Sequence, residues 1–190
     1  MSTPTPIEDA YPLSHLQAGM LFHSEFSPES AVYHDVISYH IALPYDEKAA
    51  QQAIEQVVER HEVLRTSIDM TRFSEPLQIV YRKVQMPVRT EDLREMEKGQ
   101  QKRRLSEWLE EEKRRGFEWG EAPLLRIYVH WLSNESFQWS LSFHHAILDG
   151  WSEASLMTEL LQRYQSLCRG EMPLVEKLHV RYRDYVALER

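Results

Sequence analysis

The chain has 190 residues, of which 42% are hydrophobic, so it can bury one substantial core or two small ones and is not expected to be disordered as a whole. Its formal net charge of -8 provides no broad positive field, which disfavours binding to the phosphates of nucleic acids. The sequence has a single cysteine, no apolar stretch near the roughly 20 residues of a membrane span, and no signal-peptide pattern at its start. Together these features predict a cytoplasmic protein.

The N-terminal third begins with ten residues rich in Ser, Thr, Pro and acidic side chains, which are expected to form a linker. Ser14 and Gln17 then form a capping-box pattern, in which two side chains satisfy free N–H groups at a helix start. This pattern predicts a helix over residues 14–24. β-Branched and aromatic residues are frequent over 35–43, which predicts a strand.

The middle third is predicted to start with a helix capped by Asp46, because apolar residues recur at helical spacing as far as about His61. Short strands are expected at 64–69 and 77–81. Residues 91–115 are dense in both charge signs and predict a helix with a solvated surface.

The strongest local pattern lies in the last third, where residues 124–131 and 137–143 alternate cleanly on either side of a short polar turn. This pattern predicts a β-hairpin. From Trp151, apolar residues keep helical spacing as far as Gly170, which predicts a long helix. A strand, a tight turn and a helix are therefore expected to meet between His144 and Gly150.

Two adjacent histidines stand at the end of the predicted hairpin. If the strand extends through them, their side chains point to opposite faces, and His145 shares the face of the apolar residues Phe137 to Phe143. A buried imidazole tends to stay neutral, and a neutral imidazole can accept a proton as a general base. We therefore expect His145 to be chemically active and His144 to be structural.

Other chemistry in this segment is less favoured. A metal site formed by His144, His145 and Asp149 is disfavoured because adjacent strand residues diverge. Cys168 falls within the apolar stripe of a predicted helix, and Ser152 is expected to cap that helix rather than act as a nucleophile. Gly150 is expected to provide a turn residue that tolerates unusual dihedral angles.

Four segments resemble the motifs of condensation domains from nonribosomal peptide synthetases, in the order in which that family carries them. The segment from His144 to Ser152 resembles the HHxxxDG signature, which the wider chloramphenicol-acetyltransferase-like superfamily shares. The other three are the segments 11–23, 60–66 and 182–185, and they narrow the resemblance to the condensation-domain family.

The resemblance implies an α/β fold, in the form of an α+β sandwich with a mixed, largely antiparallel sheet flanked by helices. Residues 11–180 are expected to form the N-terminal lobe of a condensation domain, after the 1–10 linker. Residues 181–190 are expected to begin the connection to a C-terminal lobe. The later motifs of full condensation domains do not follow, so the chain is expected to be a truncated lobe that is inactive on its own.

The resemblance also implies amide formation, in which an acceptor aminoacyl amine attacks a donor acyl or peptidyl thioester. Both substrates are carried on the phosphopantetheine arms of carrier proteins, which are the expected partners together with the C-terminal lobe. No metal or cofactor is expected to bind the lobe itself. His145 is implied to serve the reaction, His144 to support the site, and Asp149 to support it by pairing with Arg65. The approach of the acceptor is implied to pass Gly150 and Trp151.

Two alternatives remain open at this point. The chain could be part of a stand-alone HHxxxDG acyltransferase that uses a soluble thioester donor. It could instead be a catalytically incompetent lobe with a structural or carrier-docking role. An epimerising or cyclising relative is disfavoured, since cyclising members replace the first histidines of the signature with Asp and this chain retains both.

Overall fold

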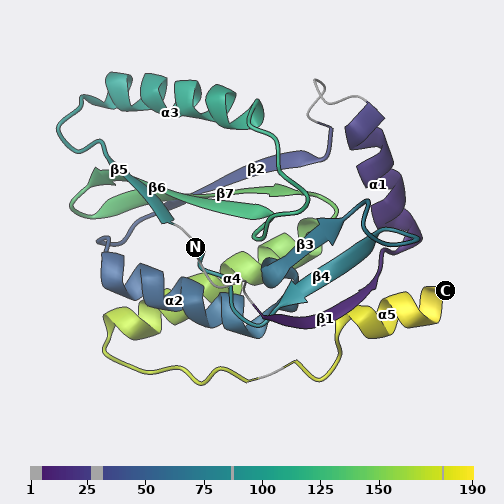
Figure 1. Cartoon of the computed structure of the whole chain (residues 1–190). Helices are drawn as coiled ribbons and strands as arrows, with labels where there is room; N and C mark the ends of the chain where they lie inside the picture. Colours follow the sequence, from purple (N-terminus) through teal and green to yellow (C-terminus); the bar gives the residue numbers. More distant parts are fainter. Residues whose placement is uncertain (1–5, 27–31, 87, 177) are drawn as a thin grey trace.

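The computed structural model describes residues 6–26, 32–86, 88–176 and 178–190. In these ranges the chain forms helices and strands that build two sheets (Figure 1). Their order is β1 (Ile7–Pro12), α1 (His15–Phe26), β2 (His34–Ile41), α2 (Glu47–Arg60), the short 3-10 helix η2 (Glu62–Arg65), β3 (Thr66–Asp69), β4 (Leu77–Tyr81), β5 (Val88–Asp92), α3 (Lys98–Lys113), β6 (Leu125–Ser133), β7 (Ser136–His144), α4 (Gly150–Cys168) and α5 (Tyr182–Glu189).

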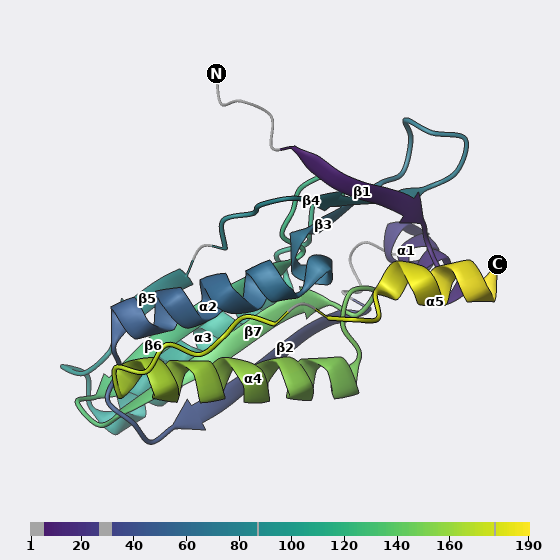
Figure 2. The ribbon, with the colours of Figure 1, turned by 90° about the horizontal axis from the view of Figure 1, so that it is seen from below.

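The larger sheet has the order β2-β7-β6-β5 and forms the centre of a three-layer arrangement. Only β5 and β6 are parallel; the other neighbours are antiparallel. Helix α3 lies over one face of this sheet, and α2 and α4 lie on the other face (Figure 1). Seen from below, α2 and α4 run side by side beneath the sheet (Figure 2). The expected α/β class, with a mixed and largely antiparallel sheet flanked by helices, is confirmed.

The main core lies between this sheet and the helices α2 and α4. β7 contributes side chains from alternate positions, and the two helices contribute residues at helical spacing, which is the pattern expected for one buried face of each element. The largest of these fully or nearly fully buried residues are Phe137, Trp139, Leu141, Phe143, Ile54, Leu160 and Tyr164. Asp46 caps α2 as predicted, because its carboxylate accepts a hydrogen bond from the backbone N–H of Ala49 at 2.9 Å.

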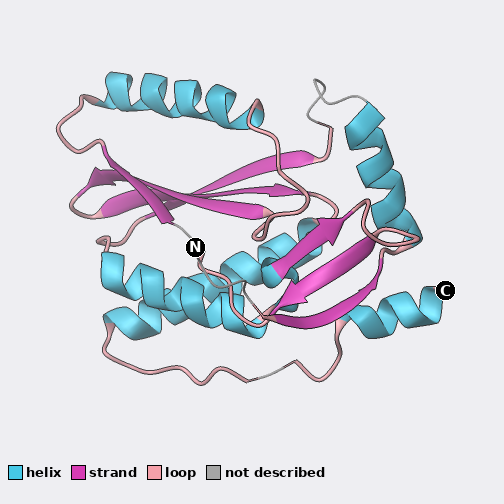
Figure 3. Ribbon diagram, viewed as in Figure 1, coloured by secondary structure: helices cyan, strands magenta, loops and turns pink. Residues whose placement is uncertain are grey.

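The smaller sheet has the order β1-β4-β3 and is antiparallel throughout (Figure 3). Residues 7–10 belong to the edge strand β1 of this sheet, so the expectation of a linker over residues 1–10 is wrong for residues 7–10. Residues 1–5 lie outside the described residues. The sequence did not predict this strand, because an edge strand pairs through its backbone on one side only and can carry polar side chains. Helix α5 packs on this sheet through Val186, which is buried with Tyr11 and Val80.

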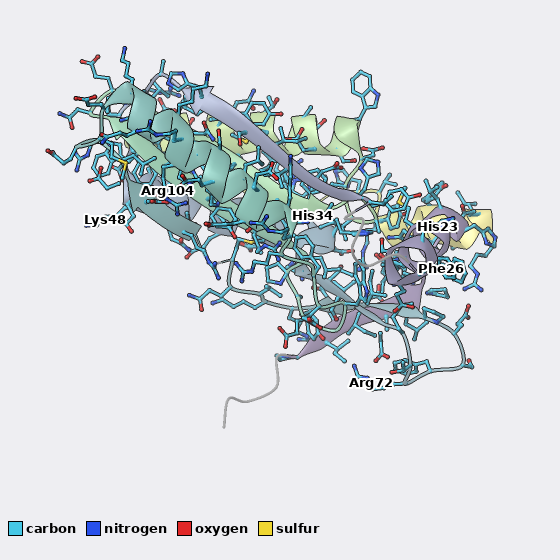
Figure 4. The ribbon with its side chains drawn as sticks, turned by 90° about the horizontal axis from the view of Figure 1, so that it is seen from above. His23, Phe26, His34, Lys48, Arg72 and Arg104 are labelled. Carbon is cyan, nitrogen blue, oxygen red and sulfur yellow. The ribbon has the colours of Figure 1, made fainter. Side chains whose placement is uncertain are left out.

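Helix α3 covers the other face of the larger sheet and is shorter than the 91–115 helix that the sequence predicts. Residues 91 and 92 belong to β5, and the helix begins at Lys98. Seen from above, α3 lies along the sheet, with Arg104 on the helix and His34 at the start of β2 (Figure 4). The buried Glu112 joins helix and sheet, since it accepts hydrogen bonds from Ser142 Oγ at 2.7 Å and from Tyr128 Oη.

Candidate active site

His145 lies just beyond the end of β7, at the point where the chain leaves the larger sheet. The strand ends at His144, and the backbone N–H of His145 donates to the carbonyl of Tyr33 at 2.7 Å. The side chain of His145 is 34% exposed and lines a cavity. The expectation that His145 is buried on the apolar face is therefore wrong, because the alternation of β7 stops one residue before it.

Asp35 on β2 is the hydrogen-bond partner of His145. Its Oδ2 lies 2.7 Å from Nδ1 of the imidazole. An ionised carboxylate can only accept, so Nδ1 carries the proton in this pair, and Nε2 of the neutral ring is left as a proton acceptor. No sequence motif identified Asp35, whose only local signal is a carboxylate at the start of a β-rich segment.

His144 is fully enclosed, and its contacts fit the structural role expected of it. The side chain has 3% exposure, Nδ1 accepts the backbone N–H of Ala146 at 3.1 Å, and Nε2 lies 2.9 Å from Ser24 Oγ. Trp119 stacks edge-on against the ring. Burial lowers the pKa of His144 to about 4, and the nearby His34 and His145 contribute in the same direction. His144 is therefore neutral near pH 7 and holds the turn that follows it.

Asp149 and Arg65 do not pair, so the ion pair implied by the family resemblance is corrected. Asp149 is exposed and caps α4, where its Oδ1 accepts the backbone N–H of Ser152 at 2.7 Å. Arg65 is buried at the end of η2, where Nε donates to the carbonyl of Val58 at 3.0 Å and a terminal nitrogen donates to Glu8 at 2.7 Å. Each side chain is satisfied locally, and the turn and the arginine belong to different parts of the chain.

The start of α4 differs from expectation at two further positions. Gly150 is the first residue of the helix with an ordinary negative φ, and a Cβ atom added there would meet no atom within 4 Å. The expected need for unusual dihedral angles is therefore wrong. Ser152 is not the helix cap, since Asp149 holds that place.

Trp151 is 86% exposed and lines the same cavity as His145. At the far end of α4, Cys168 is exposed rather than part of the apolar stripe.

The cavity beside His145 has a volume of about 500 Å³. Its walls come from α1, from the turn between His145 and Asp149, from the first half of α4, from His61 and Val63 after α2, and from Tyr182. Most of this lining is apolar, which is typical of ligand sites in which a few polar groups fix the orientation. Within the described ranges, no three His, Cys, Asp or Glu side chains converge closely enough to hold a metal ion.

A buried carboxylate ties α4 to the strand that carries Asp35. Glu153 is enclosed between helix and sheet, and Tyr39 Oη lies 3.0 Å from both of its oxygens. Burial raises the pKa of Glu153, and the negative charge of Asp35 raises it further. This link fixes β2 against α4 and so helps to place Asp35 beside His145; no local sequence pattern identified it.

Comparison with known proteins matches residues 7–190 to the Condensation domain family model. A polypeptide of the linear gramicidin synthase of Brevibacillus parabrevis is 41% identical over 166 residues, which are 87% of this chain and 2% of that protein. AMB antimetabolite synthetase AmbE of Pseudomonas aeruginosa is 36% identical over an alignment of 190 positions, which covers 98% of this chain and 9% of that protein. The chain thus spans a small part of the synthetases that it matches.

Solved structures with the same fold are more distant in sequence. The starter condensation domain of rhizomide synthetase RzmA superposes with a TM-score of 0.84 at 16% identity, covering 96% of this chain and 45% of that one. The first condensation domain of the calcium-dependent antibiotic synthetase gives a TM-score of 0.82 at 19% identity, covering 95% of this chain and 42% of that one. Because the family model matches residues 7–190 of this chain, the chain belongs to the condensation-domain family of nonribosomal peptide synthetases.

Proposed function

We propose that this chain is the N-terminal lobe of a condensation domain that forms amide bonds in nonribosomal peptide synthesis. The donor is an acyl or peptidyl thioester, and the acceptor is an aminoacyl thioester. Each is carried on the phosphopantetheine arm of a carrier protein, so the arms are substrate carriers and not cofactors of the lobe. The family match and the synthetases among its relatives support this reaction over that of a stand-alone acyltransferase.

The observation that carries the proposal is the Asp35–His145 pair at the edge of the cavity. Asp35 holds Nδ1 at 2.7 Å, so Nε2 of the neutral imidazole is available to a substrate in the cavity. Orientation of a base by a carboxylate fixes both the direction of the ring and the tautomer.

The proton chemistry assigns His145 to the bond-forming step. An α-amino group of pKa about 7.7 to 8.0 is already roughly a quarter to two-fifths neutral at pH ~7.5, so removing its proton beforehand gains little. When the amine attacks the thioester carbonyl, the new C–N bond makes the nitrogen acidic, and Nε2 of His145 takes its proton. The tetrahedral intermediate then expels the thiolate as the C–S bond breaks, and the proton on Nε2 returns to that sulfur.

The same proposal includes a partner surface on the lobe. Helices α1 and α5 meet where the backbone N–H of His15 donates to Glu189 at 3.0 Å. Around this junction Leu16 and Leu188 are mostly exposed. Apolar groups that gather on a surface mark an interaction site. We therefore infer that a further lobe or a carrier protein covers this end and that the chain alone does not turn over substrate.

The test is the variant His145→Ala in the full condensation domain that contains this chain. Carrier-bound donor and acceptor are mixed, and the amide product is measured by mass spectrometry. Loss of a positioned base should reduce the rate by at least about 100-fold. His40→Ala on the exposed side of β2 is the matched control and should retain normal activity. Normal product formation by His145→Ala would refute the catalytic role of His145. Faster turnover of soluble thioesters than of the carrier-bound ones would count against carrier-bound substrates.

A further inference from the structure

A series of hydrogen bonds reaches the active site from the face of the larger sheet that α3 covers. Ser142 Oγ on β7 lies 2.7 Å from Oε1 of Glu112 on α3 and 2.8 Å from Nε2 of His34 on β2. Figure 4 shows His34 beside the end of α3. His34 immediately precedes Asp35, and the two side chains point to opposite faces of the strand. The side chains of Glu112, Ser142 and His34 are called the relay below.

The charge of Glu112 sets the direction of the bonds in the relay. Its side chain is buried, and burial on its own raises the pKa of Glu112, but the hydrogen bonds from Ser142, Tyr128 and Arg126 outweigh burial and lower the pKa. The carboxylate is therefore ionised and can only accept, so the single hydroxyl proton of Ser142 points to Glu112. Burial lowers the pKa of His34, and Arg126 contributes in the same direction, so this ring is neutral near pH 7 and donates from Nε2 to Ser142.

The Asp35–His145 pair is too exposed to set its own geometry. The two side chains are 41% and 34% exposed, and a pair this open to water contributes little free energy. The position of Asp35 is therefore set by its backbone. Tyr33, two residues earlier, has a left-handed conformation with a φ of 69°, which is costly for a residue other than glycine and persists only where its surroundings fix it. Its carbonyl accepts the N–H of His145 at 2.7 Å, and the relay fixes the next residue, His34.

We propose that Glu112 is a positioning residue for the active site, which acts on Asp35 through Ser142 and His34. This inference rests on the proposed function and adds to it a residue from the opposite face of the sheet. The relay holds the start of β2 against β7, so that Asp35 meets Nδ1 of His145 at 2.7 Å. No side chain of the relay lines the cavity, so its effect on the reaction passes through Asp35. A displacement of about 1 Å in a catalytic group can slow a reaction by about 100-fold.

The test compares two variants of the full condensation domain, each of which removes one hydroxyl from Glu112. Replacing Glu112 itself would leave Arg126 without its carboxylate, so single hydroxyls are removed instead. Ser142→Ala breaks the relay and should slow amide formation by about three- to tenfold, because Asp35 is held less firmly. Tyr128→Phe is the matched control, since its hydroxyl contacts the other oxygen of Glu112 and does not lead to β2. It should stay within about twofold of the wild-type rate.

A second comparison separates positioning from general destabilisation. In the Asp35→Asn background the relay has no carboxylate left to place, so Ser142→Ala should slow the reaction no further. His34→Phe should cause the same loss as Ser142→Ala, and His34→Gln, whose amide can still donate to Ser142, should restore part of the rate. Equal losses in Ser142→Ala and Tyr128→Phe, or the same loss from Ser142→Ala with and without Asp35, overturn the inference.

The ¹⁵N NMR signals of the His145 ring provide a readout that does not depend on turnover, because they report which nitrogen carries the proton. The wild-type domain and Tyr128→Phe should both show the proton on Nδ1, whereas Ser142→Ala should show a mixture of the two tautomers. Identical His145 signals in Ser142→Ala and the wild type overturn the inference. If Ser142→Ala changes these signals but the wild-type domain forms no amide product, the inference stands on geometry and the proposed function is overturned.

Discussion

Asp35 and His145 are separated by 110 positions in the chain, yet Oδ2 of the first lies 2.7 Å from Nδ1 of the second. The contact follows from strand pairing, because β2 and β7 are antiparallel neighbours and Asp35 stands opposite Phe143, two residues before the histidine. Their proximity therefore depends on the sheet rather than on the turn that carries the signature.

Asp35→Asn should reduce the turnover of the full domain by at least about tenfold, because the amide holds the imidazole less firmly and does not fix its tautomer. Circular dichroism should show an unchanged fold, since Asp35 is partly exposed at the edge of the sheet. Asp92→Asn at the end of β5 is the matched control and should retain full activity. A wild-type rate in Asp35→Asn would show that His145 needs no orienting carboxylate.

Arg65 should be energetically coupled to Glu8 and not to Asp149. Its side chain is 7% exposed and satisfies the carbonyl of Val58, so Arg65→Met should cost about 2 to 4 kcal/mol of unfolding free energy. Chemical denaturation of the single and double variants gives the coupling directly. Arg65→Met with Glu8→Gln should be non-additive, whereas Arg65→Met with Asp149→Asn should be additive within about 0.5 kcal/mol. The reverse result would restore the pair that the family resemblance implied.

Asp149→Ala should lower the unfolding free energy by about 1 kcal/mol, because Asp149 is the N-cap of α4. Asp149→Asn preserves an acceptor for the N–H of Ser152 and should cost only a few tenths of a kcal/mol. Urea denaturation of the chain distinguishes the two variants. If Asp149→Ala and Asp149→Asn lower the unfolding free energy by the same amount, the charge of Asp149 matters more than its capping hydrogen bond.

His130 should make the chain less stable in acid. Burial lowers its pKa in the folded state to about 4, with a smaller contribution from Arg104, against about 6.5 in the unfolded chain. The unfolded chain therefore binds more protons between these values, and stability falls as the pH drops from 6.5 toward 4. His130→Leu should reduce this loss by about 1 to 3 kcal/mol between pH 7 and pH 4. Urea denaturation at both pH values measures this change in unfolding free energy, and His40→Leu is the exposed control. If His130→Leu and the wild type lose the same unfolding free energy between pH 7 and pH 4, the prediction is contradicted.

Elements with a strong local signal were predictable from the sequence. The alternation of 124–131 and 137–143 predicted β6 and β7 within a few residues, and the capping box of Ser14 and Gln17 is present in the structure, with both hydrogen bonds formed. The strands β1 and β5 were not predicted because both are edge strands with several charged side chains, so the usual apolar alternation is absent.

The candidate site was predictable only where it is contiguous in sequence. His145 was identified from its signature, but its exposure depends on the residue at which β7 stops, which the alternation does not reveal. Asp35 and the relay of Glu112, Ser142 and His34 come from strands and helices far apart in the chain. No spacing rule connects such residues before the fold is known.

The pairing of β2 with β7 makes this site sensitive to a kind of sequence change that leaves the signature intact. Successive side chains of a strand face opposite sides, so inserting or deleting one residue within β2 would turn Asp35 toward α3 and bring a neighbour to the cavity side. Such a one-residue slip would remove the Asp35–His145 contact with every signature residue unchanged, and under the proposed function it should lower activity. When related domains are recombined or engineered, keeping the length of this strand should therefore matter to the site as much as keeping the histidines.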